Sequence, residues 1–322
     1  MDTDAARPPA LPTRFLEPEG MVWGRFAGTD GVSLRWCHLA AAAPRINCVL
    51  VGGLTEFAEK YFETMRDLSA RGISVWCLDW RGQGGSQREA SLHASRPGPR
   101  NFDHDADDLT YFTSAMFSAA PNLPRLLVAH SMGAAIGLLA LTRNPRLFDG
   151  AVLSAPMLGI ETGRFPRLIS RLLAAAATAV GFSRHFVPGA GMWRFNAELC
   201  PATSPVSHDP ERCLVHRAWY EAHPHLRVDG ATYGWLHSAF RLTQRFRRRN
   251  LLESTTTPIL LGSAGKERFV KPKSHARAAA RLPHCRLVQF PDAKHELFME
   301  EDTVRARWLS EMDAFIAAQI VP

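Results

Sequence analysis

The sequence has no hydrophobic run of membrane-spanning length. In a chain of 322 residues, the longest strongly apolar segment extends from Leu172 to Phe182, well short of the ~20 residues that a transmembrane helix needs. The first ten residues, MDTDAARPPA, also lack the apolar stretch of a signal peptide. These absences argue against a membrane-spanning or secreted protein.

Cysteine is scarce as well, and no two cysteines form a C-x-x-C pair. The six positions are Cys37, Cys48, Cys77, Cys200, Cys213 and Cys285. Two of them lie within expected core strands, so reduced, buried thiols are a better prediction than a disulfide framework. We expect a cytoplasmic protein, with peripheral contact with the inner face of the membrane as a further hypothesis.

Charged residues make up only 21% of the chain, with a net charge of +7, and hydrophobic residues make up 46%. This balance is typical of a soluble globular protein with a sizeable core. The positive excess suits an anionic membrane surface or nucleic acid. Because neither of the two basic runs described below belongs to a recognisable nucleic-acid module, we expect no nucleic-acid partner.

Short aliphatic or β-branched runs alternate with helical patterns along most of the chain. Runs typical of buried strands lie at 46–51, 73–78, 125–129, 150–154, 258–262 and 286–290, and helical patterns near 58–70, 105–119, 133–143, 272–282 and 302–319. This alternation predicts the α/β class, with a mostly parallel central sheet and helices on both faces. Residues 21–27 and 32–38 are expected to form an antiparallel hairpin at the sheet edge.

The alternation stops between residues 157 and 250, a segment rich in Arg, Pro, Trp and His. We predict a mostly helical cap insertion there, over the carboxyl edge of the sheet, where open α/β sheets bind ligands. The expected organisation is a flexible N-terminal segment (1–20), a core in two parts (21–156 and 251–322) and the cap (157–250).

Ser131 is the predicted nucleophile. It lies in Ala129-His130-Ser131-Met132-Gly133, between a predicted strand and a helical run. A nucleophile elbow needs this order, because a strained strand-to-helix turn lifts the serine hydroxyl clear of the sheet. Small residues two positions before and after the serine let the turn close. An ordinary helix N-cap serine is the alternative.

A serine hydroxyl needs a general base, and the chain order in this kind of site is serine, acid, histidine. His295 follows the last predicted strand, and Glu267 is the carboxylate that follows the strand at 258–262. We predict that Glu267 orients His295 and stabilises its imidazolium. The alternatives are a surface-loop histidine and a surface ion pair of Glu267 with Arg268 or Lys266.

Two backbone N–H groups are predicted to bind the tetrahedral oxyanion, each worth about 100- to 1000-fold in rate. One belongs to Met132 and the other to Leu54, in the loop Gly52-Gly53-Leu54-Thr55-Glu56. A plain strand-to-helix turn would also use two glycines. The oxyanion role is therefore inferred only because Ser131, Glu267 and His295 are predicted alongside this loop. This chemistry requires no metal and no cofactor.

Several motifs follow one another in a family-specific order. They are Leu50 to Glu56 with Tyr61, DWRGQGGS at 79–86, NFD at 101–103 with DDL at 107–109, AHSMG at 129–133, SAPML at 154–158 and the loop at 262–270. From about Met21 to its C-terminus, the chain resembles the monoacylglycerol lipase and bacterial lysophospholipase branch of the α/β-hydrolases, also called serine aminopeptidase-like hydrolases. The resemblance implies the α/β-hydrolase fold and an acid loop in which Glu precedes Arg.

The oxyanion loop departs from the family pattern H-G-x-G-E…Y. Gly52 stands in place of the histidine and Thr55 in place of the second glycine, while Ala129 replaces the first glycine of the elbow. The support of the loop and the entrance of the acyl pocket are therefore expected to differ from the family's.

The predicted cap contains two basic runs. Apolar residues recur at 165, 168, 169, 172 and 173 beside the stripe Arg164, Arg167 and Arg171, and the second run spans 245–249. The first pattern fits an amphipathic helix on a lipid surface, with arginines towards phosphates and leucines towards acyl chains. The alternative, which the sequence favours, is a helix packed on the core with its basic face in solvent.

The leading hypothesis is a carboxylic ester hydrolase that cleaves a lysophospholipid or a monoacylglycerol through an acyl-enzyme on Ser131. The basic cap favours the phosphate-bearing lipid and an anionic membrane surface as a partner. A hydrolase of small esters or peptides with the same fold is one alternative. A catalytically silent, membrane-associating lipid-binding protein is the other.

Overall fold

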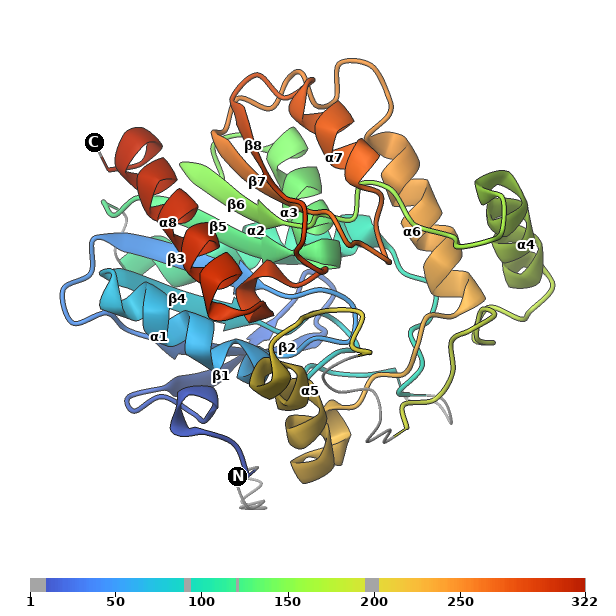
Figure 1. Ribbon diagram of the computed structural model, residues 1–322, viewed down its shortest axis with the longest axis horizontal. Helices are drawn as coiled ribbons and strands as arrows, with labels where there is room; N and C mark the ends of the chain where they lie inside the picture. The colour runs from blue at the N-terminus through green and yellow to red at the C-terminus, as the bar shows by residue number, and fades with distance from the viewer. Residues whose placement is uncertain (1–9, 90–93, 120–121, 195–202, 322) are drawn as a thin grey trace.

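The structure is a computed structural model and describes residues 10–89, 94–119, 122–194 and 203–321. Within these residues an eight-stranded sheet has the order β1-β2-β4-β3-β5-β6-β7-β8 (Figure 1). The strands are β1 (Val22–Ala27), β2 (Ser33–Leu39), β3 (Ile46–Val51), β4 (Ile73–Leu78), β5 (Arg125–His130), β6 (Gly150–Ser154), β7 (Ile259–Ala264) and β8 (Cys285–Phe290). β2 pairs antiparallel with β1 and with β4, and all other pairs are parallel.

The inner strands are buried on both faces, as their continuous apolar sequences predict. Every residue of β3, β6 and β7 is buried, because helices cover both sides of the sheet (Figure 1). One face carries α1 (Phe62–Ala70) and α8 (Asp302–Gln319), and the other carries α2 (Phe102–Met116), α3 (Ser131–Arg143) and α7 (Pro272–Ala279). The 3₁₀ turns are η1 (Thr13–Phe15), η2 (Ala58–Tyr61), η3 (Phe117–Ala119), η5 (Pro224–Leu226) and η6 (Leu297–Met299). The predicted fold class is confirmed.

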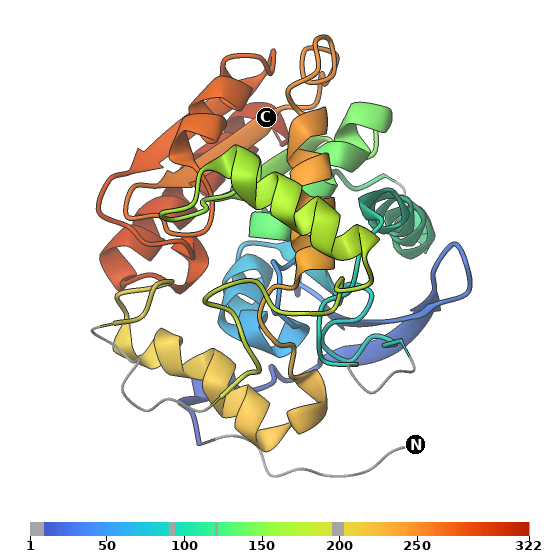
Figure 2. The same ribbon diagram turned by 90° about the vertical axis from the view of Figure 1, so that its right-hand side faces the viewer.

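The described residues between β6 and β7 form three further helices. They are α4 (Arg167–Ala179), α5 (Pro210–Ala222) and α6 (Tyr233–Arg245). α6 packs on the core beside α2 and α3 through Trp235 and Phe240, and α4 lies across α6 (Figure 2). α5 instead joins the apolar cluster of α1 and α8 through Trp219 and Tyr220. The helices of this segment therefore stand on two different parts of the core.

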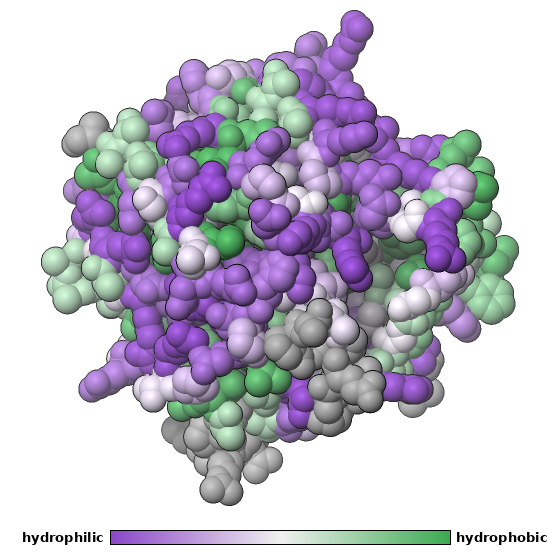
Figure 3. Space-filling model, viewed as in Figure 1, coloured by the Kyte–Doolittle hydropathy of each residue, from purple (hydrophilic) through white to green (hydrophobic). Residues whose placement is uncertain are grey.

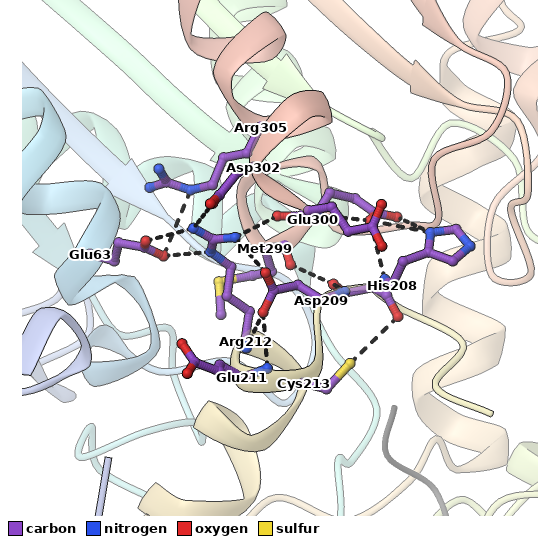
Figure 4. Close-up of polar contacts among 12 residues, drawn as sticks. Glu63, His208, Asp209, Glu211, Arg212, Cys213, Met299, Glu300, Asp302 and Arg305 are labelled. Atoms are coloured by element: carbon purple, nitrogen blue, oxygen red, sulfur yellow. Dashed lines mark hydrogen bonds and ion pairs between the residues drawn. The ribbon is translucent and has the colours of Figure 1, made fainter. Parts of the chain in front are cut away.

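A buried arginine fastens α5 to the core (Figure 4). The guanidinium of Arg212 donates to both carboxylate oxygens of Glu63 in α1, at 2.7 and 2.8 Å. It also donates to the carboxylates of Asp209 and Asp302, at 2.8 and 2.7 Å, and to the carbonyl oxygen of Glu300 at 2.9 Å. Because moving Arg212 would break its ion pair with the buried Glu63 and leave its own buried guanidinium without partners, α5 is held in one position on α1 and on the start of α8.

The apolar face of α4 is exposed, in contrast to α5. Phe165, Leu168, Ile169, Leu172 and Leu173 expose between 46% and 59% of their surface. Figure 3 shows hydrophobic side chains gathered over α4 at the right-hand edge of the molecule. The expectation that this helix packs its apolar face on the core is therefore wrong. The physical reason is that α6 takes the place against the core, and α4 rests on α6.

The N-terminal segment packs on the core where the structure describes it. Of residues 1–20, predicted as flexible, residues 1–9 lie outside the described part of the chain. Phe15, in η1, is buried in the apolar cluster of α1. Arg66 of α1 also donates to the carbonyl oxygens of Leu16 and Glu17, both at 3.2 Å. Residues 15–17 of this segment are therefore fixed to α1.

Five of the cysteines lie in the described part of the chain, and all five are free thiols. Cys200 lies outside it. Among the described helices, none combines the length and the apolar character that crossing a bilayer requires.

Candidate active site

Ser131 occupies a strained turn between β5 and α3. Its φ is 50°, in the left-handed region that costs a residue with a side chain roughly 1–2 kcal/mol. The turn closes because Gly133 has no side chain: a Cβ there would lie 2.4 Å from the carbonyl oxygen of Gly52. Ala129 is buried beside Val51 of β3, so its extra methyl group is accommodated within the sheet.

The side chains of Ser131, His295 and Glu267 form one chain of hydrogen bonds. The distance from His295 Nε2 to Ser131 Oγ is 3.0 Å, and that from His295 Nδ1 to Glu267 Oε2 is 2.6 Å. A carboxylate can only accept, so Nδ1 carries the proton. Nε2 is then free to accept the hydroxyl proton of Ser131. The structure thus brings all three predicted residues together, at the carboxyl ends of β5, β7 and β8.

Glu267 is held inside the protein and is not a surface ion-pair residue. Its side chain is fully buried, and its second carboxylate oxygen accepts from the backbone N–H groups of Arg268 and Phe269, both at 2.8 Å. Burial raises the pKa of Glu267, but the hydrogen bond and charge of His295, together with these backbone donors, outweigh it and lower the pKa. The residue is therefore a carboxylate at neutral pH.

The two predicted oxyanion donors lie near Ser131. Leu54 lines the same cavity as the serine, and Met132 follows it in the first turn of α3. The first N–H groups of a helix have no partner within the helix and carry the positive end of its dipole. The N–H of Met132 is therefore well suited to a negative oxygen bound at Ser131.

Thr55 adopts the conformation that glycine would adopt freely. Its φ is 68°, which is an outlier for a β-branched residue. Its N–H donates to Gln83 Oε1 at 3.2 Å, and its carbonyl oxygen accepts from the hydroxyl of Tyr220 at 2.7 Å. Since Tyr220 belongs to α5, the helix that Arg212 fastens to the core also supports the oxyanion loop.

A buried charge network lies behind the predicted oxyanion loop, residues 52–56. Glu56 accepts from the N–H of Gly53, from the hydroxyl of Tyr61 at 2.6 Å and from Lys60 Nζ at 2.7 Å. Lys60 Nζ also donates to Glu296 at 2.7 Å. The network thus joins the oxyanion loop to the residue that follows His295. Lys60 is not among the residues predicted from the sequence, although its i,i+4 spacing from Glu56 was a usable signal.

Lys60 supplies the positive charge that the two carboxylates of the network share. Burial raises the pKa of Glu296, and Lys60 opposes this effect. At Glu56 burial also acts to raise the pKa, but the charge and hydrogen bond of Lys60, together with His130 and the hydroxyl of Tyr61, outweigh it and lower the pKa. His130 lies against Glu56, and burial lowers its pKa to about 3, so its imidazole is neutral. The ligand atoms of Glu56, His130 and Glu296 lie within 4.8 Å of one another. Because the Lys60 ammonium already binds both carboxylates, this group is a closed ion cluster rather than an open metal site.

The serine opens into a cavity of about 650 Å³. Its wall is largely apolar. The apolar side chains are those of Phe165, which precedes α4, of Ile169 and Leu173 in α4, of Leu236 in α6 and of Phe269, which follows β7. The cavity has the size and apolar lining of a site for a drug-sized ligand, and it can accommodate an acyl chain.

Comparison with known proteins gives a consistent result. Residues 42–302 match the family model described as serine aminopeptidase, S33. Lysophospholipase L2 of Escherichia coli (strain K12) is 31% identical over 290 residues, which cover 87% of this chain and 83% of the relative. The monoacylglycerol lipase of Mycolicibacterium smegmatis is 27% identical over 282 residues, which cover 86% and 91%.

Solved structures share the fold. A soluble variant of monoglyceride lipase from Saccharomyces cerevisiae superposes with a TM-score of 0.74 at 17% identity, covering 94% of this chain and 96% of that one. A thermostable carboxyl esterase from Bacillus coagulans gives a TM-score of 0.70 at 16% identity, covering 94% and 99%. At these identities the likeness concerns the architecture alone, and that architecture is the α/β-hydrolase fold.

Proposed function

This chain belongs to the S33 serine aminopeptidase family and is a carboxylic ester hydrolase of the α/β-hydrolase fold, and on that basis we propose that it releases the fatty acid of a lysophospholipid or a monoacylglycerol through an acyl-enzyme on Ser131. The observation that carries the proposal is the hydrogen-bond chain from Ser131 through His295 to Glu267. It lies in a cavity whose apolar wall suits an acyl chain.

In the proposed first step, Ser131 Oγ attacks the ester carbonyl carbon while His295 Nε2 accepts the hydroxyl proton. Glu267, already bonded to Nδ1, stabilises the imidazolium that results. The backbone N–H groups of Leu54 and Met132 bind the oxyanion of the tetrahedral intermediate. Collapse of this intermediate breaks the bond to the glycerol oxygen, which leaves as an alcohol with the proton from His295.

Water completes the proposed cycle. His295 removes a proton from a water molecule, the resulting nucleophile attacks the acyl-enzyme, and the second tetrahedral intermediate releases the fatty acid and the Ser131 hydroxyl. The buried network of Lys60 supports both steps, because it fixes the loop that carries Leu54 and the residue next to His295.

We also propose that α4 contacts an anionic membrane surface. Phe165, Ile169 and Leu173 line the cavity, and the adjacent exposed Leu168 and Leu172 continue the apolar surface outwards. Exposed apolar side chains beside arginines are typical of helices that lie in a lipid interface. A lipid could therefore pass from the membrane to the cavity along a continuous apolar surface.

Arginines gather at the same helix. The pKa of Arg167 is lowered by burial and by the charges of Arg247, Arg171 and Arg277, so each of these three guanidiniums lies close enough to repel that of Arg167. An anionic surface would relieve this repulsion, and each arginine near such a surface contributes about 1 kcal/mol.

Vesicle sedimentation tests the membrane contact. Replacing both Leu168 and Leu172 with Ser should lower binding to anionic vesicles by about tenfold or more, since each buried leucine contributes up to ~2 kcal/mol. Val22→Ser, at an exposed apolar residue on β1, is the matched control and should bind as the wild type does. Equal binding by the double variant would refute the contact.

A substrate panel with purified protein tests the reaction. We expect the wild type to hydrolyse 1-oleoyl lysophospholipid and 1-oleoylglycerol faster than short p-nitrophenyl esters or aminoacyl amides. Ser131→Ala should abolish hydrolysis while leaving the thermal unfolding transition in place. Unchanged turnover by Ser131→Ala would end the proposal. A preference for aminoacyl amides would replace it with peptide hydrolysis.

A further inference from the structure

A second cavity, of about 510 Å³, adjoins the first on the side of Glu267. Arg268 lines both cavities. Lys266 and Lys294 also line the second one, beside residues 203–205. Three cationic side chains thus surround a hollow that opens next to the candidate active site.

These cations have few anionic partners. Lys266 lies 3.5 Å from Asp292, but the Asp292 side chain is 90% exposed, and such a surface pair contributes little. Lys294 Nζ donates to the carbonyl oxygen of Ser207 at 3.0 Å. Within the described residues, no carboxylate forms an ion pair with the side chain of Lys294 or Arg268. The site therefore retains most of its positive charge.

The acids nearby are occupied elsewhere. Glu267 lines the second cavity, but its two oxygens are taken by His295 and by backbone N–H groups. In the first cavity, Glu161 faces Lys271 at 3.8 Å, and Glu296 is bound by Lys60. Glu267 thus brings one negative charge to the second cavity beside three positive ones, and both of its oxygens are already engaged.

Two of the three cations are chain neighbours of the predicted catalytic residues. Arg268 directly follows Glu267 and Lys294 directly precedes His295, and the side chains of Glu267 and His295 meet at 2.6 Å. In a lysophospholipid the glycerol backbone separates the scissile ester from the phosphate. An ester held at Ser131 with its acyl chain in the first cavity would therefore extend its headgroup towards the second.

We propose that Lys266, Arg268 and Lys294 bind the phosphate of the substrate headgroup, so that the preferred substrate is a phosphate-bearing single-chain lipid rather than a monoacylglycerol. This inference rests on the proposed function. A guanidinium binds phosphate oxygens through two parallel, charge-assisted hydrogen bonds. A neutral glycerol headgroup would gain nothing from the three charges, which repel one another when no anion is present.

The test compares two lipids with the same acyl chain, 1-oleoylglycerol and 1-oleoyl-glycero-phosphoglycerol, each diluted in a large excess of neutral detergent so that the micelle surface carries little charge. The wild type should have the higher kcat/KM on the phospholipid. In Arg268→Gln the ratio of the two kcat/KM values should fall by about tenfold or more, the loss expected when the charge-assisted hydrogen bonds of one guanidinium are removed. Adding Lys266→Gln should lower it further, and Arg268→Lys should restore part of it.

Arg146→Gln is the matched control. Arg146 is exposed and lies beyond the far end of α3, whose 13 residues carry the chain about 20 Å from Ser131.

Glycerol 3-phosphate provides a second readout: it should inhibit the wild type competitively and lose this effect in Arg268→Gln, whereas glycerol should inhibit neither.

The two levels of failure are distinguishable. If the wild type hydrolyses both lipids but the ratio stays unchanged in Arg268→Gln and in the double variant, the phosphate site is refuted and the proposed function stands. If inorganic phosphate inhibits as strongly as glycerol 3-phosphate, the site binds free phosphate and the headgroup assignment is overturned. If the wild type hydrolyses neither lipid, the proposed function fails first.

Discussion

Replacement of Lys60 with Met is expected to destabilise the protein strongly and to impair its activity. Lys60 is 3% exposed, and its Nζ donates to Glu56 and Glu296, each at 2.7 Å. Methionine fills a similar volume without the charge, so two carboxylates remain buried close together without a cation. Removing one partner of a buried ion pair costs about 3–5 kcal/mol, and we expect a loss of that size in the free energy of unfolding at pH 7.

The deficit should depend on pH in a definite direction. In the wild type, Lys60 holds the pKa of Glu56 below its usual value, so this stabilisation is present above the unfolded pKa of about 4.3. It is lost as pH falls towards the folded pKa. Without Lys60, burial raises the pKa of both carboxylates, and they become neutral as pH falls. The difference between variant and wild type should therefore shrink between pH 7 and pH 4.

Urea unfolding followed by tryptophan fluorescence measures this difference. Lys273→Met, at an exposed lysine of α7, is the control and should change stability by less than about 0.5 kcal/mol. The double variant Lys60→Met with Glu296→Gln should recover part of the loss, because it removes one of the two stranded charges. A loss below about 1 kcal/mol in Lys60→Met, with hydrolysis intact, would refute the role assigned to the network.

Three further substitutions test other parts of the site. Glu267→Gln keeps the size of the side chain but removes the charge that stabilises the imidazolium, so kcat on 1-oleoylglycerol should fall by roughly 10⁴-fold; a loss below tenfold would show that another group orients the histidine. Thr55→Gly relieves a left-handed conformation that costs roughly 1–2 kcal/mol, but glycine adds an entropic cost of about 0.5–1 kcal/mol. Urea unfolding should therefore show a small net stabilisation. A clear fall in the free energy of unfolding would contradict strain at this position. His275 is buried between Ser263 Oγ and the carbonyl oxygen of Pro156, both at 2.8 Å, and burial lowers its pKa to about 4. The stability that neutral His275 contributes is present above the unfolded pKa of about 6.5 and falls by about 3 kcal/mol as pH drops to the folded pKa. The wild type should therefore lose about that much more stability than His275→Gln over this pH range. Parallel curves of stability against pH for the two proteins would contradict the assignment.

Much of the fold could be predicted because the relevant patterns are local. β3 (Ile46–Val51) and β4 (Ile73–Leu78) coincide with the predicted apolar runs, since a strand buried on both faces must be apolar at nearly every position. Ser131 and His295 could be paired across 164 residues because the order of strands fixes the order of the loops at the carboxyl edge. Their proximity agrees with the prediction, while their catalytic roles stay a proposal.

Other features depend on contacts that a sequence does not reveal. Lys60 and Glu296 are 236 residues apart, and no local pattern indicates that an ammonium group would be enclosed by two carboxylates. At α4 the periodicity shows an apolar stripe but does not say which element covers it. Leu168 and Leu172 are exposed because α6 takes the place against the core. The left-handed Thr55 depends in the same way on Tyr220, from a distant helix.

The central claim is that Ser131 forms the acyl-enzyme, and labelling with a fluorophosphonate tests it most directly. After incubation with the probe, digestion and mass spectrometry should locate the phosphonyl group on Ser131 in the wild type and find none in Ser131→Ala. Excess 1-oleoyl lysophospholipid should slow the labelling. Failure of Ser131 to label, in protein whose folding is intact, would contradict serine catalysis and favour a lipid-binding protein that retains the fold.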